Sequence, residues 1–233
     1  MKFKEIDIRG ELKKINSMEY IRTKRPGDTG IGFTLETLLG LRETNIRNRQ
    51  DFSYNNVPTE LKTQRKSTSS MMTLFTLEPN KGRFNDRKLI ELFGYIDRSG
   101  RDALKVTLTT NGFVPQGLGL DFTVSELCVI DEDSNRYWVW NRENLAPKID
   151  SLVIVLANTR GRGANEHFFY NEAYYLKNLD YRRFFNLFDR GYLVVDLRMH
   201  IKDNGSVRNR GTAFRIRGLN NLLNCYSHRE RLL

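Results

Sequence analysis

The chain has 233 residues, of which 39% are hydrophobic and 28% are charged. This length suits one domain or two joined lobes, and the apolar content excludes a disordered or collagen-like chain. Lys and Arg outnumber Asp and Glu by 38 to 28, so the net charge of +10 favours a polyanionic partner.

The location of the protein can be inferred from what the sequence lacks. No apolar run approaches the ~20 residues that span a bilayer, and the first residues, MKFKEIDIRGELKK, lack the apolar stretch of a signal peptide. Cys128 and Cys225 have neither metal-like nor disulfide-like spacing. We therefore expect a cytoplasmic protein in a reducing environment, without membrane contact.

The first half of the chain predicts a helix followed by strands. A basic loop at residues 22–32 leads into a helix at 33–40, and a polar connection follows at 41–50. Residues 51–66 read as a hairpin that begins near Asp51 and turns at Asn55–Asn56, with its second strand starting at about Val57. Further strands are expected at residues 71–79, 103–110, 120–131 and 136–141.

The second half predicts an apolar strand at 151–161 and a helical stretch at 171–191 that Gly191 ends. Strands are then expected at 192–201 and 211–218. The fold class is therefore mixed α/β. We place a soft boundary near residue 155, with lobes at 1–155 and 156–233 that are free to interleave.

The second lobe carries much of the positive charge. From Ser151 to the end there are 12 Arg and 2 Lys against 7 acidic residues, a net charge of +7. The planar guanidinium of Arg matches phosphates and guanine edges, so this composition indicates nucleic acid as the partner. A basic enzyme of another kind would show the same charge.

The strongest candidate for catalysis is Asp51 followed by Glu60 and Lys62. Side chains two apart on a strand share a face, and a closed hairpin would bring Asp51 to the same edge. Two carboxylates suit Mg²⁺, which would neutralise charge on a phosphodiester and acidify water, while Lys62 would orient or help deprotonate that water. Glu36, on the preceding helix, would add another acid. A solvated strand face explains the same pattern.

Several segments resemble a known family. GDTGIGFTLETLLG, DFSYNNVPTELKTQRK and MTLFT-x-x-P resemble the amino-terminal half of the MutH-like restriction endonucleases of the BcnI/MvaI group, within the PD-(D/E)XK nuclease superfamily. FFYNEAYYL, RRFFNLFDRGYLVVDLRMHI and RNRGTAFRI are similar to its recognition half in order and spacing. The resemblance covers residues 22–217, and residues 84–150 match less distinctly.

The resemblance implies a PD-(D/E)XK core, in which a central mixed sheet is flanked by helices, and two lobes that form a cleft for double-stranded DNA. It implies a monomeric, Mg²⁺-dependent type II endonuclease that cuts the two strands sequentially at a short G·C-rich site, of the CC-N-GG type. No obligate protein partner is expected, and a cognate DNA methyltransferase would belong to the same system. The catalytic set would be Asp51, Glu60, Lys62 and Glu36, with Asp51 and Glu60 as metal ligands.

The resemblance also assigns candidate DNA contacts. Asp196 and Arg198 would align with residues that read bases in the major groove, and an Asp-x-Arg pair suits a G·C base pair. Arg208 and Arg210 stand where the family pattern His-x-His-Gly-Thr-x-x-Arg has histidines, so the target sequence is open. The remaining candidates are Arg215 from that pattern and, near the catalytic hairpin, Lys24 and Arg25.

Each of these residues also has an interpretation without base recognition. Asp196 and Arg198 would also form a surface ion pair on a strand, and Arg208 and Arg210 would also contact phosphates alone from a loop. Two other functions fit the chain as a whole. One is a strand-nicking endonuclease of mismatch repair, and the other is a basic DNA-binding protein without catalysis.

Overall fold

The computed structural model of the chain describes residues 3–41, 50–146 and 149–233. The chain forms two compact units, each assembled from separate stretches. Val155, at the expected boundary, is fully buried within a strand of unit 1, so the chain does not divide there. Unit 1 comprises residues 1–70, 148–180 and 223–233, and unit 2 comprises residues 71–147 and 181–222.

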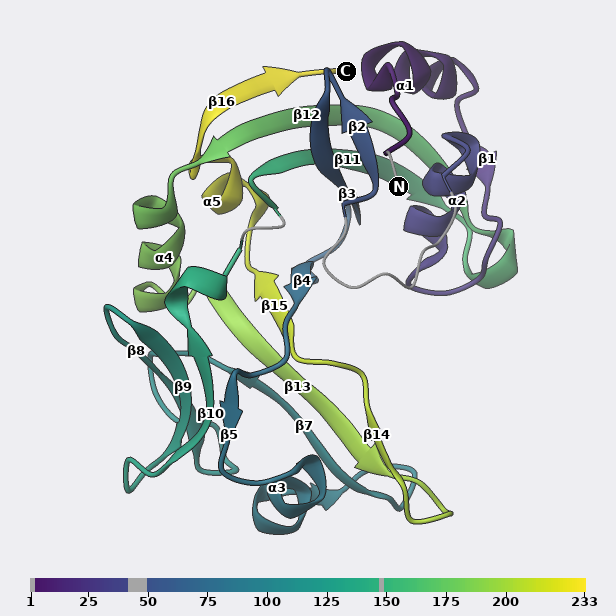
Figure 1. The fold of residues 1–233 in the computed structure, drawn as a ribbon. Helices are drawn as coiled ribbons and strands as arrows, with labels where there is room; N and C mark the ends of the chain where they lie inside the picture. Colours follow the sequence, from purple (N-terminus) through teal and green to yellow (C-terminus); the bar gives the residue numbers. More distant parts are fainter. Residues whose placement is uncertain (1–2, 42–49, 147–148) are drawn as a thin grey trace. The chain divides into compact units, whose positions relative to one another are not determined.

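Unit 1 is built on a mixed sheet with the strand order β1-β12-β11-β3-β2, in which β16 also pairs with β12 (Figure 1). β3 runs parallel to β11, and the other pairings are antiparallel. The elements are α1 (Ile8–Ser17), β1 (Ile21–Arg22), α2 (Gly30–Leu38), β2 (Phe52–Tyr54), β3 (Val57–Arg65), β11 (Ser151–Arg160), η3 (Gly163–Asn165), β12 (His167–Leu179) and β16 (Tyr226–Arg231).

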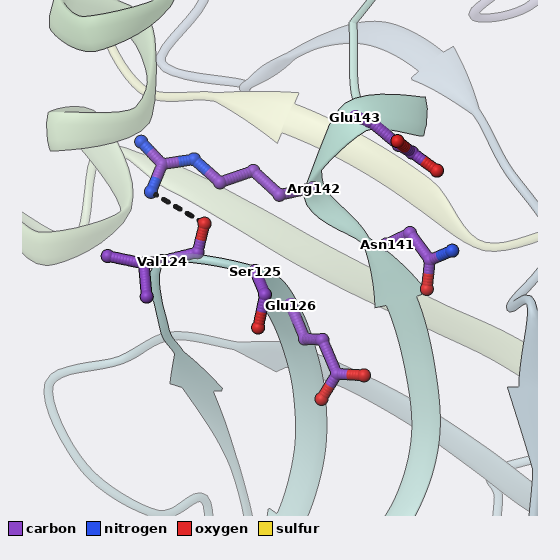
Figure 2. Close-up of a pocket in the computed structure, with 6 residues that line it drawn as sticks. All are labelled: Val124, Ser125, Glu126, Asn141, Arg142 and Glu143. Atoms are coloured by element: carbon purple, nitrogen blue, oxygen red, sulfur yellow. Dashed lines mark hydrogen bonds between the residues drawn. The ribbon is translucent and has the colours of Figure 1, made fainter.

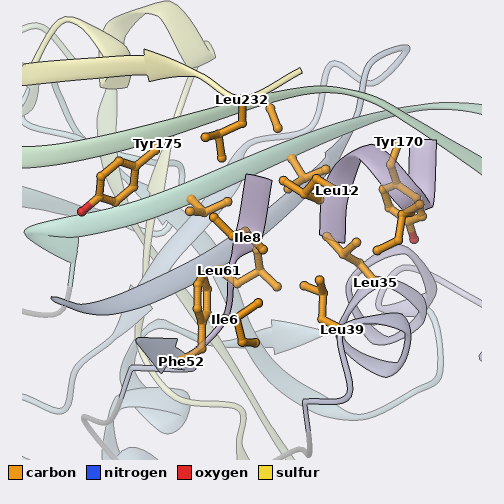
Figure 3. Packing of buried hydrophobic residues seen from close by; sticks show 14 of the residues in the cluster. Ile6, Ile8, Leu12, Leu35, Leu39, Phe52, Leu61, Tyr170, Tyr175 and Leu232 are labelled. Atoms are coloured by element: carbon orange, nitrogen blue, oxygen red, sulfur yellow. The ribbon is translucent and has the colours of Figure 1, made fainter. Parts of the chain in front are cut away.

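The core of unit 1 lies between this sheet and helices α1 and α2 (Figure 3). Leu12 of α1 and Leu35 of α2 are fully buried, and both belong to one cluster with Leu61 of β3. α1 begins at Asp7, whose side chain accepts a hydrogen bond from the Gly10 N–H and caps the helix. This packing fixes the strand that carries the candidate catalytic residues.

Unit 2 contains two sheets, with the orders β5-β10-β9-β8 and β4-β15-β13-β7-β6, and β14 pairs with β13. Long strands β7 and β13 run side by side and antiparallel (Figure 1). The elements are β4 (Met72–Thr76), β5 (Lys81–Gly82), α3 (Asp86–Phe93), β6 (Tyr95–Ile96), β7 (Asp102–Leu108), β8 (Leu118–Phe122), β9 (Glu126–Asp131), β10 (Arg136–Asn141), η1 (Arg142–Asn144), α4 (Tyr181–Asp189), β13 (Leu193–Ile201), β14 (Val207–Asn209) and β15 (Ala213–Ile216). A short helix, α5 (Leu219–Leu223), ends where the chain returns to unit 1.

The mixed α/β class predicted from the sequence is confirmed, and most of the strands stand where they were expected. The helix predicted over 171–191 is wrong in its first half, because residues 171–179 belong to β12 and only Tyr181–Asp189 are helical. β12 is paired on both edges, and this tertiary pairing overrides the local preference. The polar connection at 41–50 lies almost entirely outside the described residues. No helix among the described residues is both long and apolar enough to cross a membrane.

Candidate active site

The hairpin that carries the candidate catalytic residues forms as predicted. β2 and β3 are joined at Asn55–Asn56, whose φ angles of 52° and 62° lie in the left-handed region that Asn tolerates. Phe52 pairs with Thr59, which brings the preceding Asp51 alongside β3. The Asp51 N–H donates to the Thr59 carbonyl at 3.1 Å, and the Leu61 N–H donates to Asp51 Oδ2 at 2.7 Å. The hairpin therefore holds the Asp51 carboxylate beside the backbone of residues 59–61.

Glu60 and Lys62 share one face of β3 and form an ion pair. Lys62 Nζ lies 2.6 Å from Glu60 Oε1, and the Glu60 side chain is almost completely buried while Lys62 is partly exposed. β3 is held between β2 and β11, where Leu152 pairs with Glu60 and Ile154 with Lys62. The pair is therefore positioned by a strand that is hydrogen-bonded on both edges.

Hydroxyl groups beneath this strand were not identified from the sequence. Thr59 is fully buried, and its Oγ1 lies 2.8 Å from Ser151 Oγ on β11. Ser151 Oγ in turn donates to the Tyr175 hydroxyl at 3.5 Å. These bonds satisfy buried polar groups and tie β3 to β11 and β12. Nothing in the local sequence of Thr59 indicates its partner, because Ser151 is 92 residues away.

Glu36 lies in α2, one turn after Gly32. Gly32 leaves little room for a side chain, since a Cβ there would lie 3.3 Å from Thr63 Oγ1 and 3.8 Å from Glu36 Oε1. Thr63 alternates along β3 with Glu60 and Lys62 and therefore faces the α2 side. The Thr63 hydroxyl and the Glu36 carboxylate thus both lie close to Gly32.

Lys24 and Arg25 lie in the loop between β1 and α2. The Lys24 side chain is exposed, and its backbone N–H donates to Thr34 Oγ1 at 2.9 Å. The Arg25 guanidinium stacks on the Phe33 ring, 3.7 Å from its centroid. Lys24 therefore offers its charge to solvent, whereas Arg25 is held against α2.

A partly buried ion pair anchors the same loop. Arg65 Nε and Nη2 donate to the two carboxylate oxygens of Glu166 at 2.7 and 2.8 Å. The same guanidinium donates to the carbonyls of Gly27 and Asp28 at 3.1 and 3.2 Å. The hydrogen bond to Glu166 raises the pKa of Arg65. Arg65 therefore links the end of β3 to the loop that carries Lys24.

In unit 2, Asp196 lies at the centre of a hydrogen-bonded cluster. Its Oδ2 accepts from Arg198 Nη2 at 2.7 Å and from Arg215 Nη1 at 2.6 Å, and its Oδ1 accepts from Thr107 Oγ1 at 2.5 Å. Burial opposes ionisation, but the bonds from Thr107, Arg215 and Arg198 outweigh it and lower the pKa of Asp196. Arg215 also donates to the Met71 carbonyl at 2.7 Å.

The exposure of this cluster differs from the sequence expectation. The Asp196 side chain is 0% exposed, whereas that of Arg198 is 48% exposed. A surface ion pair therefore does not describe Asp196, and in this arrangement a base could reach Arg198 but not the Asp196 carboxylate. The loop expected around Arg208 is also replaced by a strand, because Arg208 lies exposed in β14, opposite His200. Arg210 follows it, exposed, and its N–H donates to the Arg198 carbonyl at 3.2 Å.

A separate pocket of about 470 Å³ lies in unit 2 (Figure 2). Arg142 spans it, donating to the Val124 carbonyl at 3.4 Å and stacking 4.4 Å from the Phe185 ring centroid. These contacts give Arg142 a structural role at the pocket, whose walls contain none of the candidate site residues. The lining residues are Val124, Ser125, Glu126, Asn141, Arg142 and Glu143.

Comparison with known proteins places this geometry in context. The model of the MvaI/BcnI restriction endonuclease family matches residues 9–226. A structure of restriction endonuclease MvaI in complex with its cognate DNA substrate is similar over 97% of both chains, with 24% identity and a TM-score of 0.80. A structure of MvaI in the absence of DNA matches over 97% of this chain and 96% of that one, with 21% identity and a TM-score of 0.53. No curated protein sequence matches significantly.

Proposed function

The chain belongs to the MvaI/BcnI restriction endonuclease family, and we propose that this type II restriction endonuclease uses Mg²⁺ to cut duplex DNA at a short G·C-rich site. The observation that carries the proposal is the closed hairpin, which holds the Asp51 carboxylate on the backbone of the strand that carries the Glu60–Lys62 pair. The similar MvaI structure bound to its cognate DNA supports duplex DNA as the substrate. We further propose that the recognition site is of the CC-N-GG type. The enzyme would act as a monomer that cuts one strand after the other.

The donor atoms near the hairpin suit Mg²⁺. Among the described residues, no cluster of three or more His, Cys, Asp or Glu side chains is placed to hold a metal. Mg²⁺ does not need one, because it keeps several waters and is commonly bound by one or two carboxylates together with substrate phosphates. Asp51 and Glu60 would supply those carboxylates. Bound there, Mg²⁺ would neutralise phosphate charge and lower the pKa of a water molecule.

The protein side chains have separate roles in this proposal. Lys62, held by Glu60 and partly exposed, would donate a hydrogen bond that orients the attacking water or stabilises the phosphate. The Leu61 N–H fixes the Asp51 carboxylate, so this group would need little reorganisation when it binds the metal. Glu36, from α2, would act as an additional acid near the water shell.

The second unit would read the sequence through arginine. The half-exposed Arg198 is oriented by the buried Asp196 carboxylate, and a fixed guanidinium can donate bidentately to guanine O6 and N7. Arg215, which is bonded to Asp196 and to the Met71 carbonyl, would support Arg198 at the DNA. Arg208, Arg210 and Lys24 are exposed cations suited to phosphates or bases. We also expect a methyltransferase that modifies the same site and protects host DNA.

The test is digestion of unmethylated phage DNA by the purified protein, with Mg²⁺ and separately with EDTA, followed by sequencing of the ends. Discrete Mg²⁺-dependent fragments with 5′-phosphates and G·C pairs on both sides of the cut are expected. Nicked circles alone would instead indicate a strand-nicking repair enzyme. Binding without cleavage under both conditions would leave a non-catalytic DNA-binding protein.

A further inference from the structure

One face of the β7–β13 pair in unit 2 is polar along most of its length. The antiparallel register places Thr107 opposite Asp196 and Lys105 opposite Arg198. Side chains at alternate positions of both strands point the other way and are buried. On the polar face, Lys105 and Arg198 are exposed, whereas Asp196 and His200 are buried. The buried residues of the opposite face include Leu104, Val106, Leu108, Val195, Leu197 and Met199.

A second acid-centred cluster lies on this polar face, next to the Asp196 cluster. Asp97 Oδ2 accepts from Arg101 Nη2 at 2.8 Å and from Lys105 Nζ at 2.5 Å. Its side chain is only 7% exposed, while those of Arg101 and Lys105 are 34% and 36% exposed. A mostly buried carboxylate thus fixes two partly exposed cations, as Asp196 fixes the half-exposed Arg198 and the more buried Arg215.

Positive charge exceeds negative charge around this second cluster. Lys105 stands directly opposite Arg198, and like charges in such cross-strand pairs repel each other. His200 lies beside Arg101, with 3.3 Å between its Nε2 and Arg101 Nη1, and opposite Arg208. Burial, together with the charges of Arg101, Lys105 and Arg208, lowers the pKa of His200, so the imidazole adds no positive charge at neutral pH. The negative charges that oppose these cations are the carboxylates of Asp97 and Asp203, and Asp203 acts on Arg101.

We propose that Arg101 and Lys105 bind phosphates of the DNA backbone and so extend the DNA contact surface along β7 beyond Arg198. The proposal rests on the proposed function, because it takes duplex DNA as the ligand. Phosphate suits this pair better than a base edge, because Asp97 already occupies part of each donor set and a lysine ammonium acts as a point charge. A phosphate at this position would also relieve the repulsion between Lys105 and Arg198.

The experiment measures binding of two fluorescein-labelled duplexes in EDTA, one carrying the mapped cleavage site and one with that site scrambled. Wild type, Arg101→Ala, Lys105→Ala and Lys105→Arg are titrated at several salt concentrations, and thermal unfolding confirms that each is folded. Lys88→Ala is the matched control, because Lys88 is an exposed lysine of the same unit that pairs with Glu91 on α3. Cleavage of phage DNA by wild type is followed in parallel.

Each alanine variant should weaken binding to both duplexes equally and reduce the slope of log affinity against log salt by about 0.9 per lost phosphate contact. Between about 50 and 200 mM salt, the affinity of such a variant should therefore fall by a factor roughly threefold smaller than the factor for wild type. Lys105→Arg and Lys88→Ala should keep the wild-type slope. Unchanged slopes in both alanine variants, or a loss of affinity confined to the duplex with the site, would overturn the phosphate contact. Cleavage by wild type would still uphold the proposed function in that case. Failure of wild type to bind either duplex would overturn both.

Discussion

The Asp51 carboxylate accepts a hydrogen bond from the backbone N–H of Leu61, with 2.7 Å between Oδ2 and N. Leu61 lies between Glu60 and Lys62, and its side chain is buried in the core of unit 1. One bond therefore ties the first acid of the pattern to the strand that carries the other two residues. The spacing of nine residues between Asp51 and Glu60 is what a hairpin with the Asn55–Asn56 turn requires for this contact.

Asp51→Asn should separate the structural role of this side chain from its proposed chemical role. The amide oxygen of Asn can still accept from the Leu61 N–H, so the melting temperature should change little. The proposed metal ligand loses its charge, so we expect cleavage to fall by at least two orders of magnitude, on the scale of lost electrostatic stabilisation. Cleavage rates over a range of Mg²⁺ concentrations and thermal unfolding measure the two effects.

Asp51→Ala is the comparison for that variant, because it removes the acceptor as well as the charge. It should be less stable than Asp51→Asn by about 1–3 kcal/mol, the cost of leaving a buried donor without its bond. Equal unfolding free energies for the two variants would show that the bond to Leu61 adds nothing to stability. Full cleavage by Asp51→Asn would remove Asp51 from the metal site.

Lys62→Ala should retain DNA binding and lose cleavage. A positioned side chain of this kind contributes on the order of 10²–10⁴-fold to rate, and single-turnover cleavage with binding in EDTA measures both quantities. The variant also leaves Glu60 buried without its cation, so unfolding must be followed to show that the protein is intact. Lys14→Ala, which removes an exposed lysine paired with Glu11 in the same unit, is the control. Cleavage by Lys62→Ala at the control rate would exclude Lys62 from the mechanism.

The parts of the site that follow from local sequence could be predicted, and the parts made by distant pairing could not. Alternation along β3 and the turn residues Asn55–Asn56 predicted the hairpin, because both act over a few residues. The anchoring of Arg65 by Glu166 joins positions 101 residues apart, and no periodicity reports such a pair. The alternation of its strand leaves Asp196 open to an alternative reading as part of a surface ion pair, yet its side chain is buried and bonded to Thr107 and two arginines.

Secondary structure shows the same limit. Residues 171–179 contain the helix formers Glu172, Ala173, Leu176 and Lys177, but β12 is hydrogen-bonded on both edges in the sheet of unit 1. The strand β11, which contains Val155, joins that sheet by parallel pairing with β3, so the soft boundary expected near residue 155 lies within a core strand. Such pairings depend on loop closure over about a hundred residues, and a single sequence carries little information about them.

Asp196→Asn should destabilise the protein in a pH-dependent way. The pKa of Asp196 is lowered in the folded chain, whereas an unfolded Asp titrates near ~3.9. The carboxylate therefore contributes its full stability above about pH 4 and loses it as the pH falls through the folded pKa. At pH 7 we expect a loss of about 1–3 kcal/mol, because the hydrogen bonds from Thr107 and the two arginines lose their charged acceptor while the half-exposed Arg198 stays solvated. Urea unfolding of both proteins from pH 7 to pH 3 should show this difference shrinking with acid, and a difference that stays constant would contradict the assignment.

Arg65→Lys should loosen the loop that carries Lys24 without unfolding unit 1. A lysine ammonium can still pair with Glu166, but it cannot also span the Gly27 and Asp28 carbonyls that the guanidinium fork reaches. We expect faster amide hydrogen exchange in residues 23–31 with an unfolding free energy lower by only about 1 kcal/mol. Lys66→Ala is the matched control, because it breaks the adjacent ion pair with Glu172 and leaves the loop anchor intact. If DNA affinity falls together with protection in Arg65→Lys but not in the control, the anchored loop contributes to binding. Equal exchange in residues 23–31 of both variants would show that Arg65 does not restrain the loop.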